Sequence, residues 1–405
     1  MDRIIKYTTW KDVAREMAGR SLALFGAGNI ASKTHRNMPT VPLTAIFDNA
    51  SNLWGEEELG VVIRNPADWA SLPSRPFILI TTTSFREVSE QLLSMGLSPG
   101  TDFVVSPVLN DLRIIDEMES IESRLMFTSG SPRADDPDYG GGIYEMGVKR
   151  DTWSHVKKIT GNCYGITAFE ENYVTVDTER GMVEFDSNYK IVRSRELPHG
   201  ARAHGVCYDA NRGRFYVTCS YLDAVLELDK DFQQLSQIQI SHKRNRYGSP
   251  SHHCNDCCVW EDSLFVSMFS LNGNWKRDVF DGGVLEIDIE THEIIGPAAT
   301  GFWMPHNVTF INGGFTLLDS LPGHLRANNL QVIGAFPAFT RGLAHDGMFH
   351  YIGQSRNRNY SRNLGRSRNI SIDAGVIVFD EYTKVSRFLQ LPPRVSEIHS
   401  LKMLS

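Results

Sequence analysis

The sequence predicts two fold classes in one chain: a small α/β domain built on a parallel sheet, then an all-β domain that forms a six-bladed β-propeller. Two observations carry this prediction. A glycine-rich turn follows an apolar strand near the N-terminus, and the short motif Met304–Ile311 occurs in six related copies through residues 160–405. Six related units in a row are typical of a repeat architecture arranged around one axis. A chain of 405 residues is long enough for both domains.

The composition is that of a globular protein with a sizeable core, since 41% of the residues are apolar and 22% are charged. The formal net charge of −7 gives no overall basic field for nucleic acid or an anionic membrane. The N-terminal residues contain no apolar segment of signal-peptide length, and no run approaches a membrane span. We therefore expect a cytoplasmic protein with neither nucleic acid nor membrane as a partner. The pattern leaves open whether the protein is a homo-oligomer.

All six cysteines lie in the repeat region, between Cys163 and Cys258. In a cytoplasmic protein we expect buried, reduced thiols rather than disulfides. The pair Cys254 and Cys257 also has the spacing of half a zinc ribbon or of a redox pair. No second pair of this spacing exists to complete a four-thiolate site.

The N-terminal domain, residues 1–106, is predicted to be Rossmann-like. An apolar strand ends at Gly26, and a Gly-x-Gly-x-x-Ala turn then leads into a helix, while Asp48 follows the next strand. Such a turn offers backbone amides to a phosphate at a helix N-terminus, and the later carboxylate is placed for ribose hydroxyls. The candidate cofactor-binding residues are Gly26, Gly28, Asn29 and Asp48.

Residues 20–106 resemble the small Rossmann-like domains attached to bacterial surface-polysaccharide and sugar-nucleotide proteins. The segments that carry this resemblance are Phe25–Ala31, Phe47–Asn49, Trp54–Gly55, Gly60 and Asn65–Pro66. The resemblance implies a nucleotide or nucleotide-sugar ligand. Two alternatives remain. One is an NAD(P) site, and the other is a degenerate unit that only packs, since no Tyr-x-x-x-Lys follows the glycines. Residues 107–123 are expected to form a linker helix.

The repeat domain, residues 124–405, is predicted from strands of alternating polarity. Each copy of the opening motif is followed by a second apolar strand and then by a third strand. The third strand ends in an acidic or polar turn. The expected third strands are 142–146, 182–186, 225–229, 284–288, 330–333 and 376–380. Six such units predict a six-bladed β-propeller. The domain begins on a second strand and ends on an opening strand, so the C-terminal strand should close the ring and remove its exposed edge.

Opening strands line the central channel of a propeller, so the residue that leads into each strand lies at the channel mouth. These residues are, in chain order, Tyr164, His204, Asn255, His306, Arg341 and His399. Three of them are histidines in alternate units. Neutral imidazoles that converge on one axis are typical ligands of zinc or iron. We therefore expect a divalent metal on His204, His306 and His399, and the alternative is a metal-free site in which histidines act as acid and base.

This arrangement resembles the three-histidine centre of the propeller-type peptidylglycine amidating lyases and, more loosely, the metal-centred lactonase propellers. The repeat domain is also similar to uncharacterised bacterial propeller domains found in glycan-type gene neighbourhoods. The first resemblance implies a metal that keeps open positions for water or substrate.

Further candidate residues lie beside the histidines. Asp256 is expected to orient a ligating imidazole or to act as a base, and Tyr164 and Arg341 to donate hydrogen bonds to a substrate oxyanion. Asn255 and His253 are candidate substrate-binding residues.

A loop of the fifth unit carries five arginines in an acidic chain, which are Arg356, Arg358, Arg362, Arg366 and Arg368. We expect the loop to lie over the channel mouth, with Arg356, Arg358 and Arg362 binding an anionic group. A plain solvated loop is the alternative.

Together these features predict a metal-dependent enzyme of lyase, hydrolase or isomerase type, with its active site at the channel mouth. The expected substrate is small and anionic, and a nucleotide-linked sugar in bacterial glycan or secondary-metabolite biosynthesis is a candidate. Two other classes stay open: a non-catalytic propeller scaffold with a nucleotide-sensing Rossmann domain, and an NAD(P)-dependent oxidoreductase.

Overall fold

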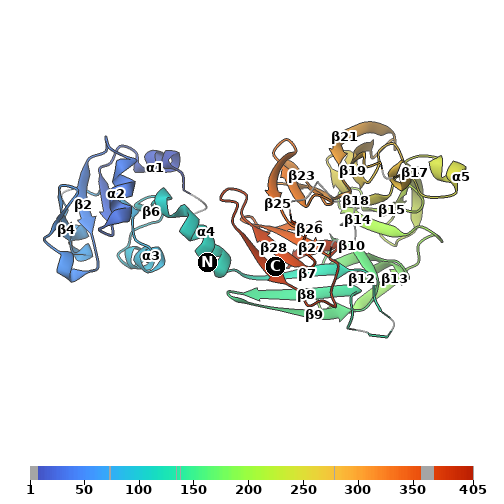
Figure 1. The fold of residues 1–405 in the computed structure, drawn as a ribbon, viewed down its shortest axis with the longest axis horizontal. Helices are drawn as coiled ribbons and strands as arrows, with labels where there is room; N and C mark the ends of the chain where they lie inside the picture. The colour runs from blue at the N-terminus through green and yellow to red at the C-terminus, as the bar shows by residue number, and fades with distance from the viewer. Residues whose placement is uncertain are drawn as a thin grey trace. The chain divides into compact units, whose positions relative to one another are not determined.

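The computed structural model describes residues 8–72, 74–133, 135–136, 138–277, 279–356 and 369–404. The chain forms two compact units, Met1–Glu119 and Ser120–Ser405 (Figure 1). No helix in the described ranges is long and apolar enough to cross a membrane.

The first unit is a six-stranded sheet with helices. The sheet order is β3-β4-β2-β1-β5-β6, and every neighbouring pair is parallel except β3 with β4. Its strands are β1 (Leu22–Phe25), β2 (Leu43–Phe47), β3 (Glu57–Glu58), β4 (Val61–Arg64), β5 (Phe77–Ile80) and β6 (Phe103–Val105). Its helices are α1 (Trp10–Met17), α2 (Asn29–Arg36), α3 (Phe85–Ser94) and α4 (Asn110–Glu119). The predicted parallel sheet is therefore present, and α4 belongs to this unit.

The glycine-rich turn joins β1 to α2 in a tight, extended conformation. Gly26 has a φ of +111°, and a Cβ on it would lie 3.0 Å from the carbonyl carbon of Thr81, so only glycine fits there. Asp48 accepts hydrogen bonds from the amides of Ala27 (2.8 Å) and Ala50 (2.8 Å), one with each carboxylate oxygen. Both oxygens of Asp48 are thus used inside the unit. Nucleotide binding at this turn stays a prediction.

The second unit is a six-bladed β-propeller, as predicted. From the axis outwards, the blades are β30-β7-β8-β9, β10-β11-β12-β13, β14-β15-β16-β17, β18-β19-β20-β21, β22-β23-β24-β25 and β26-β27-β28-β29. The innermost strands are β30 (Ser400–Leu404), β10 (Cys163–Phe169), β14 (Ala203–Asp209), β18 (Cys254–Trp260), β22 (Pro305–Ile311) and β26 (Phe339–His345). Each contacts the next around the ring, and β30 lies between β26 and β10. The C-terminal strand therefore closes the ring.

The outer strands complete each blade by antiparallel pairing. The second strands are β7 (Glu122–Ser129), β11 (Asn172–Asp177), β15 (Arg214–Cys219), β19 (Ser263–Met268), β23 (Gly314–Asp319) and β27 (His350–Ser355). The third strands are β8 (Gly142–Lys149), β12 (Gly181–Phe185), β16 (Ala224–Leu228), β20 (Gly282–Asp288), β24 (His324–Ala327) and β28 (Gly375–Phe379). The outermost strands are β9 (Thr152–Ile159), β13 (Ile191–Arg195), β17 (Gln234–Gln239), β21 (Ile294–Phe302), β25 (Gln331–Ala335) and β29 (Ser386–Gln390).

One predicted third strand is wrong. Residues 330–333 fall at the start of the outermost strand β25, and the third strand of that blade is β24. The segment His324–Ala327 is short and carries two polar side chains, so its alternation was less visible than the apolar run that follows it.

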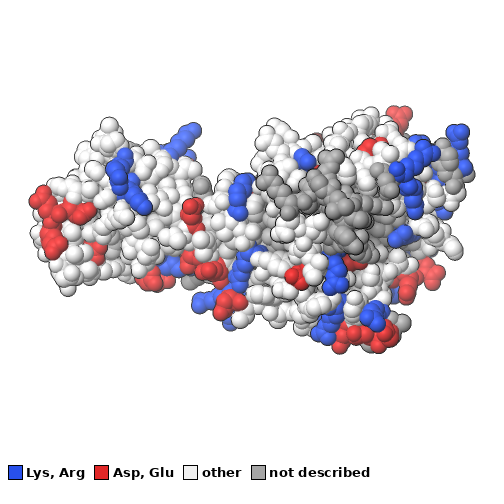
Figure 2. Space-filling view, viewed as in Figure 1, with Lys and Arg blue, Asp and Glu red and all other residues white. Residues whose placement is uncertain are grey.

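The core of the propeller lies between neighbouring blades. One cluster joins Val174 and Val176 of β11 to Phe215 and Val217 of β15, and all four side chains are fully buried. Packing of apolar faces from adjacent sheets holds the inner strands at fixed positions around the channel. All six cysteines are free thiols, and four of them are buried. On the face shown in Figure 2, acidic and basic side chains of the propeller are interspersed, so no single-sign field covers it.

Candidate functional site

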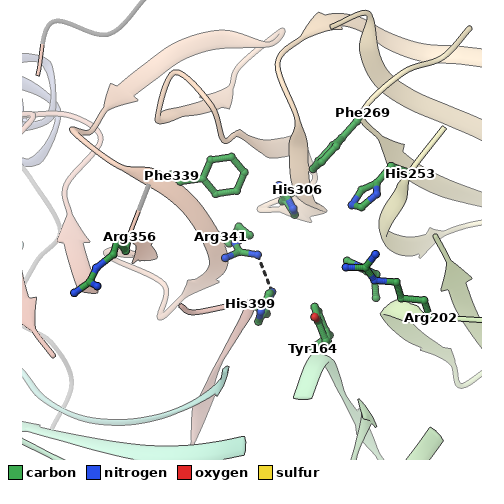
Figure 3. A pocket seen from close by; sticks show the side chains of 10 residues that line it. Tyr164, Arg202, His253, Phe269, His306, Phe339, Arg341, Arg356 and His399 are labelled. Atoms are coloured by element: carbon green, nitrogen blue, oxygen red, sulfur yellow. Dashed lines mark hydrogen bonds between the residues drawn. The ribbon is translucent and has the colours of Figure 1, made fainter. Parts of the chain in front are cut away.

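A cavity of about 160 Å³ lies at the channel mouth, where the inner strands begin. We call it the mouth cavity, and it is lined by Tyr164, Arg202, His204, His253, Phe269, His306, Phe339, Arg341, Arg356 and His399 (Figure 3). Five of the six residues predicted at the mouth line it. Asn255 does not appear in this lining and is almost fully buried, with its Nδ2 donating to the Pro305 carbonyl at 3.2 Å.

Irregular strand register places these side chains. The inner strands β10, β14, β18, β22 and β26 each lose regular pairing just after their first or second residue. A β-bulge at this point turns a side chain out of the normal alternation, as bulges beside active sites commonly do. The following glycines permit close contact between strands, since a Cβ on Gly205 would lie 2.6 Å from the carbonyl oxygen of Asn255.

A second repeat position also faces the mouth, and of its residues sequence reasoning named His253 but missed Arg202, Phe339 and Glu397. The residue two places before each predicted mouth residue contributes Arg202, His253 and Phe339 to the cavity lining, and Glu397 to the network below it. Arg202 and His253 have left-handed φ values of 45° and 56°, a conformation that few non-glycine residues adopt. The alignment of the repeats could have identified this position, because it lies at a fixed spacing from the predicted mouth residues. No repeat pattern marks Phe269, which directly follows β19.

His306 presents an unprotonated nitrogen to the cavity. Its Nδ1 lies 2.9 Å from the Met304 carbonyl oxygen and 2.7 Å from Ser320 Oγ. Because a carbonyl oxygen can only accept, Nδ1 carries the proton and Nε2 keeps its lone pair. Burial, and then the charge of Arg341, hold the pKa of His306 well below its usual value of 6.5. His306 is therefore a neutral proton acceptor at pH 7.

The other two imidazoles on this wall are also neutral. Burial, followed by the proximity of His253, holds the pKa of His204 well below 6.5. Burial, followed by the charge of Arg202, lowers the pKa of His253 to about 3. The His253 ring stacks on Phe269 with centroids 4.3 Å apart. His204, His253 and His306 therefore add no positive charge to the cavity at pH 7.

Arg341 is the buried charge at the centre of the site. Its Nη1 lies 3.0 Å from His399 Nδ1, the contact drawn in Figure 3, and its Nη2 lies 3.2 Å from Glu397 Oε2. Nη2 also donates to Ser355 Oγ at 3.3 Å. His399 Nε2 lies 3.1 Å from the same Glu397 oxygen. Arg341, His399 and Glu397 are each less than a tenth exposed, so they form one buried polar network.

These contacts do not fit the predicted three-histidine metal centre. Across the part of the chain that the structure describes, no three His, Cys, Asp or Glu side chains are grouped so as to hold a metal ion. His399 directs Nδ1 at a guanidinium, and its Nε2 lies against the backbone of Gly130, where an added Cβ would be 2.7 Å away. The Tyr164 ring lies between His204 and His399, at 4.7 and 4.2 Å from their centroids. In this structure His399 is a hydrogen-bonding partner of Arg341, and the metal centre stays a prediction.

Asp256, which is expected to orient a ligating imidazole or to act as a base, is not in the lining of the mouth cavity. It faces a different cavity further along the channel. Its Oδ2 accepts the amide of Asn307 at 2.9 Å, and Asn307 Oδ1 in turn accepts the amide of Gly342 at 2.6 Å. These two side chains brace neighbouring inner strands. Residues 255 and 256 both fall in the irregular stretch between Cys254 and Cys257, and sequence spacing alone does not reveal how such a stretch directs its side chains.

Of the arginine loop, Arg356 lies within the described residues. It lines the mouth cavity, while its Nε donates to the Ile372 carbonyl at 3.2 Å. Arg358 and Arg362 lie outside the described residues, as do Arg366 and Arg368. Together with Arg202 and Arg341, Arg356 makes the described lining of the mouth cavity cationic.

Replacing His306 with Gln should flatten the dependence of stability on pH. Because the pKa of His306 is lower in the folded protein than the unfolded value near 6.5, the unfolded chain binds more protons below pH 6.5. The free energy of unfolding of the wild type should therefore fall as pH decreases, by about 1.4 kcal/mol per pH unit from this residue. Denaturant unfolding at pH 7, 6 and 5 measures the slope. Equal slopes for wild type and His306→Gln would contradict the assignment of His306 as buried and neutral.

Comparisons with known proteins identify the propeller fold. Residues 253–405 match the family model described as Domain of unknown function (DUF4915), which covers less than half of the chain. A sequence comparison with curated proteins finds no match. Among solved structures, one chain of a nidogen/laminin complex has a TM-score of 0.50 at 11% identity, with 69% of this chain and 98% of that chain covered.

Two bacterial propellers are also similar. Regucalcin from Agrobacterium tumefaciens, titled a calcium-binding protein, has a TM-score of 0.40 at 10% identity, covering 54% of this chain and 70% of that chain. An inactive variant of virginiamycin B lyase from Staphylococcus aureus has a TM-score of 0.39 at 8% identity, covering 68% and 85%. At these identities the likeness concerns the fold alone.

Proposed function

We propose that the protein is an enzyme that uses acid–base chemistry at the mouth cavity to act on a small anionic substrate. The observation that carries this proposal is the pairing of the buried, cationic Arg341 with the neutral imidazole of His306, whose Nε2 lone pair faces the same cavity. A fixed cation and an unprotonated base in one cavity are the elements of proton abstraction next to a carboxylate or an ester.

The roles follow from the donor pattern. Arg341, supported by Arg202 and Arg356 at the rim, binds the anionic group and stabilises negative charge that develops beside it. His306 accepts the substrate proton at Nε2, because its low pKa keeps this nitrogen unprotonated at pH 7. Tyr164, whose hydroxyl points into the cavity in Figure 3, returns a proton to the leaving group or to the opposite face. This set of roles suits a lyase, hydrolase or isomerase step.

The size of the cavity limits the substrate. A water molecule needs roughly 10–15 Å³ of such space, so about 160 Å³ holds on the order of ten waters or a group of similar size, such as a sugar acid ring. A nucleotide-linked sugar in glycan or secondary-metabolite biosynthesis remains our preferred substrate class, with only its sugar or phosphate end inside the cavity.

Turnover of a panel of sugar acids, aldonolactones and sugar nucleotides tests the proposal. With a compound that is turned over, His306→Gln should lower kcat by about 10²- to 10⁴-fold, the usual contribution of a general base. Arg341→Lys should mainly raise KM, because a lysine cannot reproduce the forked contact. His292→Gln, in the turn between β20 and β21, is the matched control and should leave both constants unchanged. Binding without turnover for every compound would instead favour a non-catalytic binding module.

Metal analysis decides between acid–base and metal chemistry. One observation favours metal chemistry as the second candidate. Among the described residues, the buried Nε2 of His204 has no hydrogen-bond partner, and His306, which has a free lone pair, lines the same cavity. We expect purified protein to carry well below one zinc or iron per chain, and chelation to leave turnover unchanged. One bound ion per chain that is lost in a His204→Ala, His306→Ala double variant would overturn the acid–base proposal and restore a metal centre.

A further inference from the structure

A second cavity lies further along the channel, beyond the ring of bulges, and has a volume of about 360 Å³. We call it the channel cavity. All six inner strands contribute to its wall, through the residues that follow the predicted mouth residues, such as Gly165, Val206, Asp256, Val308, Leu343 and Leu401. Most of this wall is backbone, small or apolar side chains and thiols. The mouth cavity and the channel cavity share no lining residue.

Two charged side chains face the channel cavity, and they have opposite signs. Asp256 comes from β18 and Lys402 from β30. The ring order of the inner strands is β30, β10, β14, β18, β22 and β26, so three steps separate β30 from β18 in either direction. The carboxylate and the ammonium group therefore lie on opposite walls of the channel.

These charges do not neutralise one another. Within the described residues, Lys402 is in no ion pair. The Asp256 carboxylate accepts one hydrogen bond there, at Oδ2 from the backbone amide of Asn307. Asp256 Oδ1 is left for a ligand. Burial raises the pKa of Asp256 to about 6 and lowers the pKa of Lys402, as expected for charges that have lost water without gaining a partner. His345 also lines this wall, and its Nδ1 accepts a hydrogen bond from the backbone amide of Gly347 at 3.0 Å.

We propose that the channel cavity is a binding site for a small zwitterion, a molecule of the amino-acid class whose ammonium group pairs with Asp256 and whose carboxylate pairs with Lys402. Charge complementarity selects this class. A simple anion would be attracted to Lys402 but repelled by Asp256. A simple cation would be attracted to Asp256 but repelled by Lys402. A molecule that carries both charges meets an opposite charge at each wall, while its methylene or side-chain atoms pack on the apolar strands between them.

A series of ω-amino acids measures the separation of the two charged walls. Glycine, β-alanine, 4-aminobutyrate and 6-aminohexanoate place the ammonium and the carboxylate progressively further apart. We expect calorimetric titration of the full-length protein to detect binding that depends on chain length and is strongest for one member. Hexanoate and hexylamine, each with one charge, should bind at least about 10-fold more weakly than that member, because each loses one charge-assisted contact.

Three variants locate the site. Asp256→Asn keeps an acceptor for the Asn307 amide, and Lys402→Met keeps the length of the aliphatic stem, so both preserve packing. Each should weaken binding of the best ω-amino acid by about 10- to 100-fold. Lys190→Met, an exposed lysine after β12, is the charge control and should bind as the wild type does. His306→Ala alters the mouth cavity alone and should also leave the affinity unchanged.

Several results would overturn the inference. Absence of binding for the whole series, equal affinity for hexanoate and for the best ω-amino acid, or wild-type affinity in Lys402→Met would each exclude a zwitterion site between these walls. Loss of binding in His306→Ala would move the ligand to the mouth cavity. Circular dichroism and the thermal midpoint of each variant show whether it is folded. Because the mouth cavity is tested by His306 and the channel cavity by Asp256 and Lys402, the two proposals fail separately.

Discussion

Deletion of residues 398–405 is expected to unfold the propeller. The C-terminal strand β30 pairs with β7 along its whole length, from Ser400 opposite Thr128 to Leu404 opposite Arg124, and it also packs against β10 and β26. Ile398 is fully buried, and Leu401 is 4% exposed. The truncated chain loses the burial of these two side chains, which is worth roughly 1.5–3 kcal/mol each. It also opens the ring and leaves the inner edge of β7 unpaired.

The expected result is a loss of most of the 5–15 kcal/mol that typically stabilises a domain. Far-UV circular dichroism, thermal unfolding and limited proteolysis of the truncated chain measure it. A synthetic peptide of residues 394–405, added in trans, should restore part of the signal, because the vacated strand position is the one that the peptide fits. Ile398→Val, which removes a single methylene, should cost only about 0.5–1.5 kcal/mol and serves as the mild control. A truncated protein with a native thermal midpoint would show that closure contributes little.

The propeller was predictable because its signals are local. Alternation along each strand and a recurring entry motif identified six blades and the closing strand before any contact was known. The mouth was predictable for the same reason, since a repeat position maps to one place in a ring. The channel-facing direction of Asp256 was not predictable, because one bulge residue changes which side of the strand faces the channel.

The chemistry of the histidines depended on tertiary contacts that the repeat pattern does not contain. His306 and His399 occupy corresponding positions at the mouth, yet one donates from Nδ1 to a backbone carbonyl and the other meets a guanidinium. The difference comes from Arg341, which the neighbouring blade supplies, and from Glu397, two residues before His399. Three histidines at one repeat position therefore do not have the same environment, and a metal centre inferred from position alone does not follow.

The electrostatic balance of the mouth rests on one buried pair. Arg341 and Glu397 have side chains that are 8% and 4% exposed, and their closest atoms are 3.2 Å apart. Each would be costly to bury alone, and His399 and Ser355 satisfy two further donors of the guanidinium. If Arg341 also binds the substrate anion, Glu397 sets how much of its charge is available. This balance can be tested by removing each partner in turn.

Replacement of Arg341 with Met should destabilise the propeller by about 3–5 kcal/mol, the usual effect of leaving a buried charge without its partner. The double variant Arg341→Met, Glu397→Gln should recover a large part of that loss, because no unpaired carboxylate remains.

Since a buried, unpaired carboxylate is stabilised by taking up a proton, the single variant should gain stability relative to the wild type as pH falls from 7 to 5, and the double variant should not. Denaturant unfolding of the wild type, Arg341→Met, Glu397→Gln and the double variant at both pH values completes the cycle. If the losses in the two single variants simply add in the double variant, Arg341 and Glu397 are not energetically coupled, and the cation at the mouth is held in place by the surrounding strands rather than by its carboxylate.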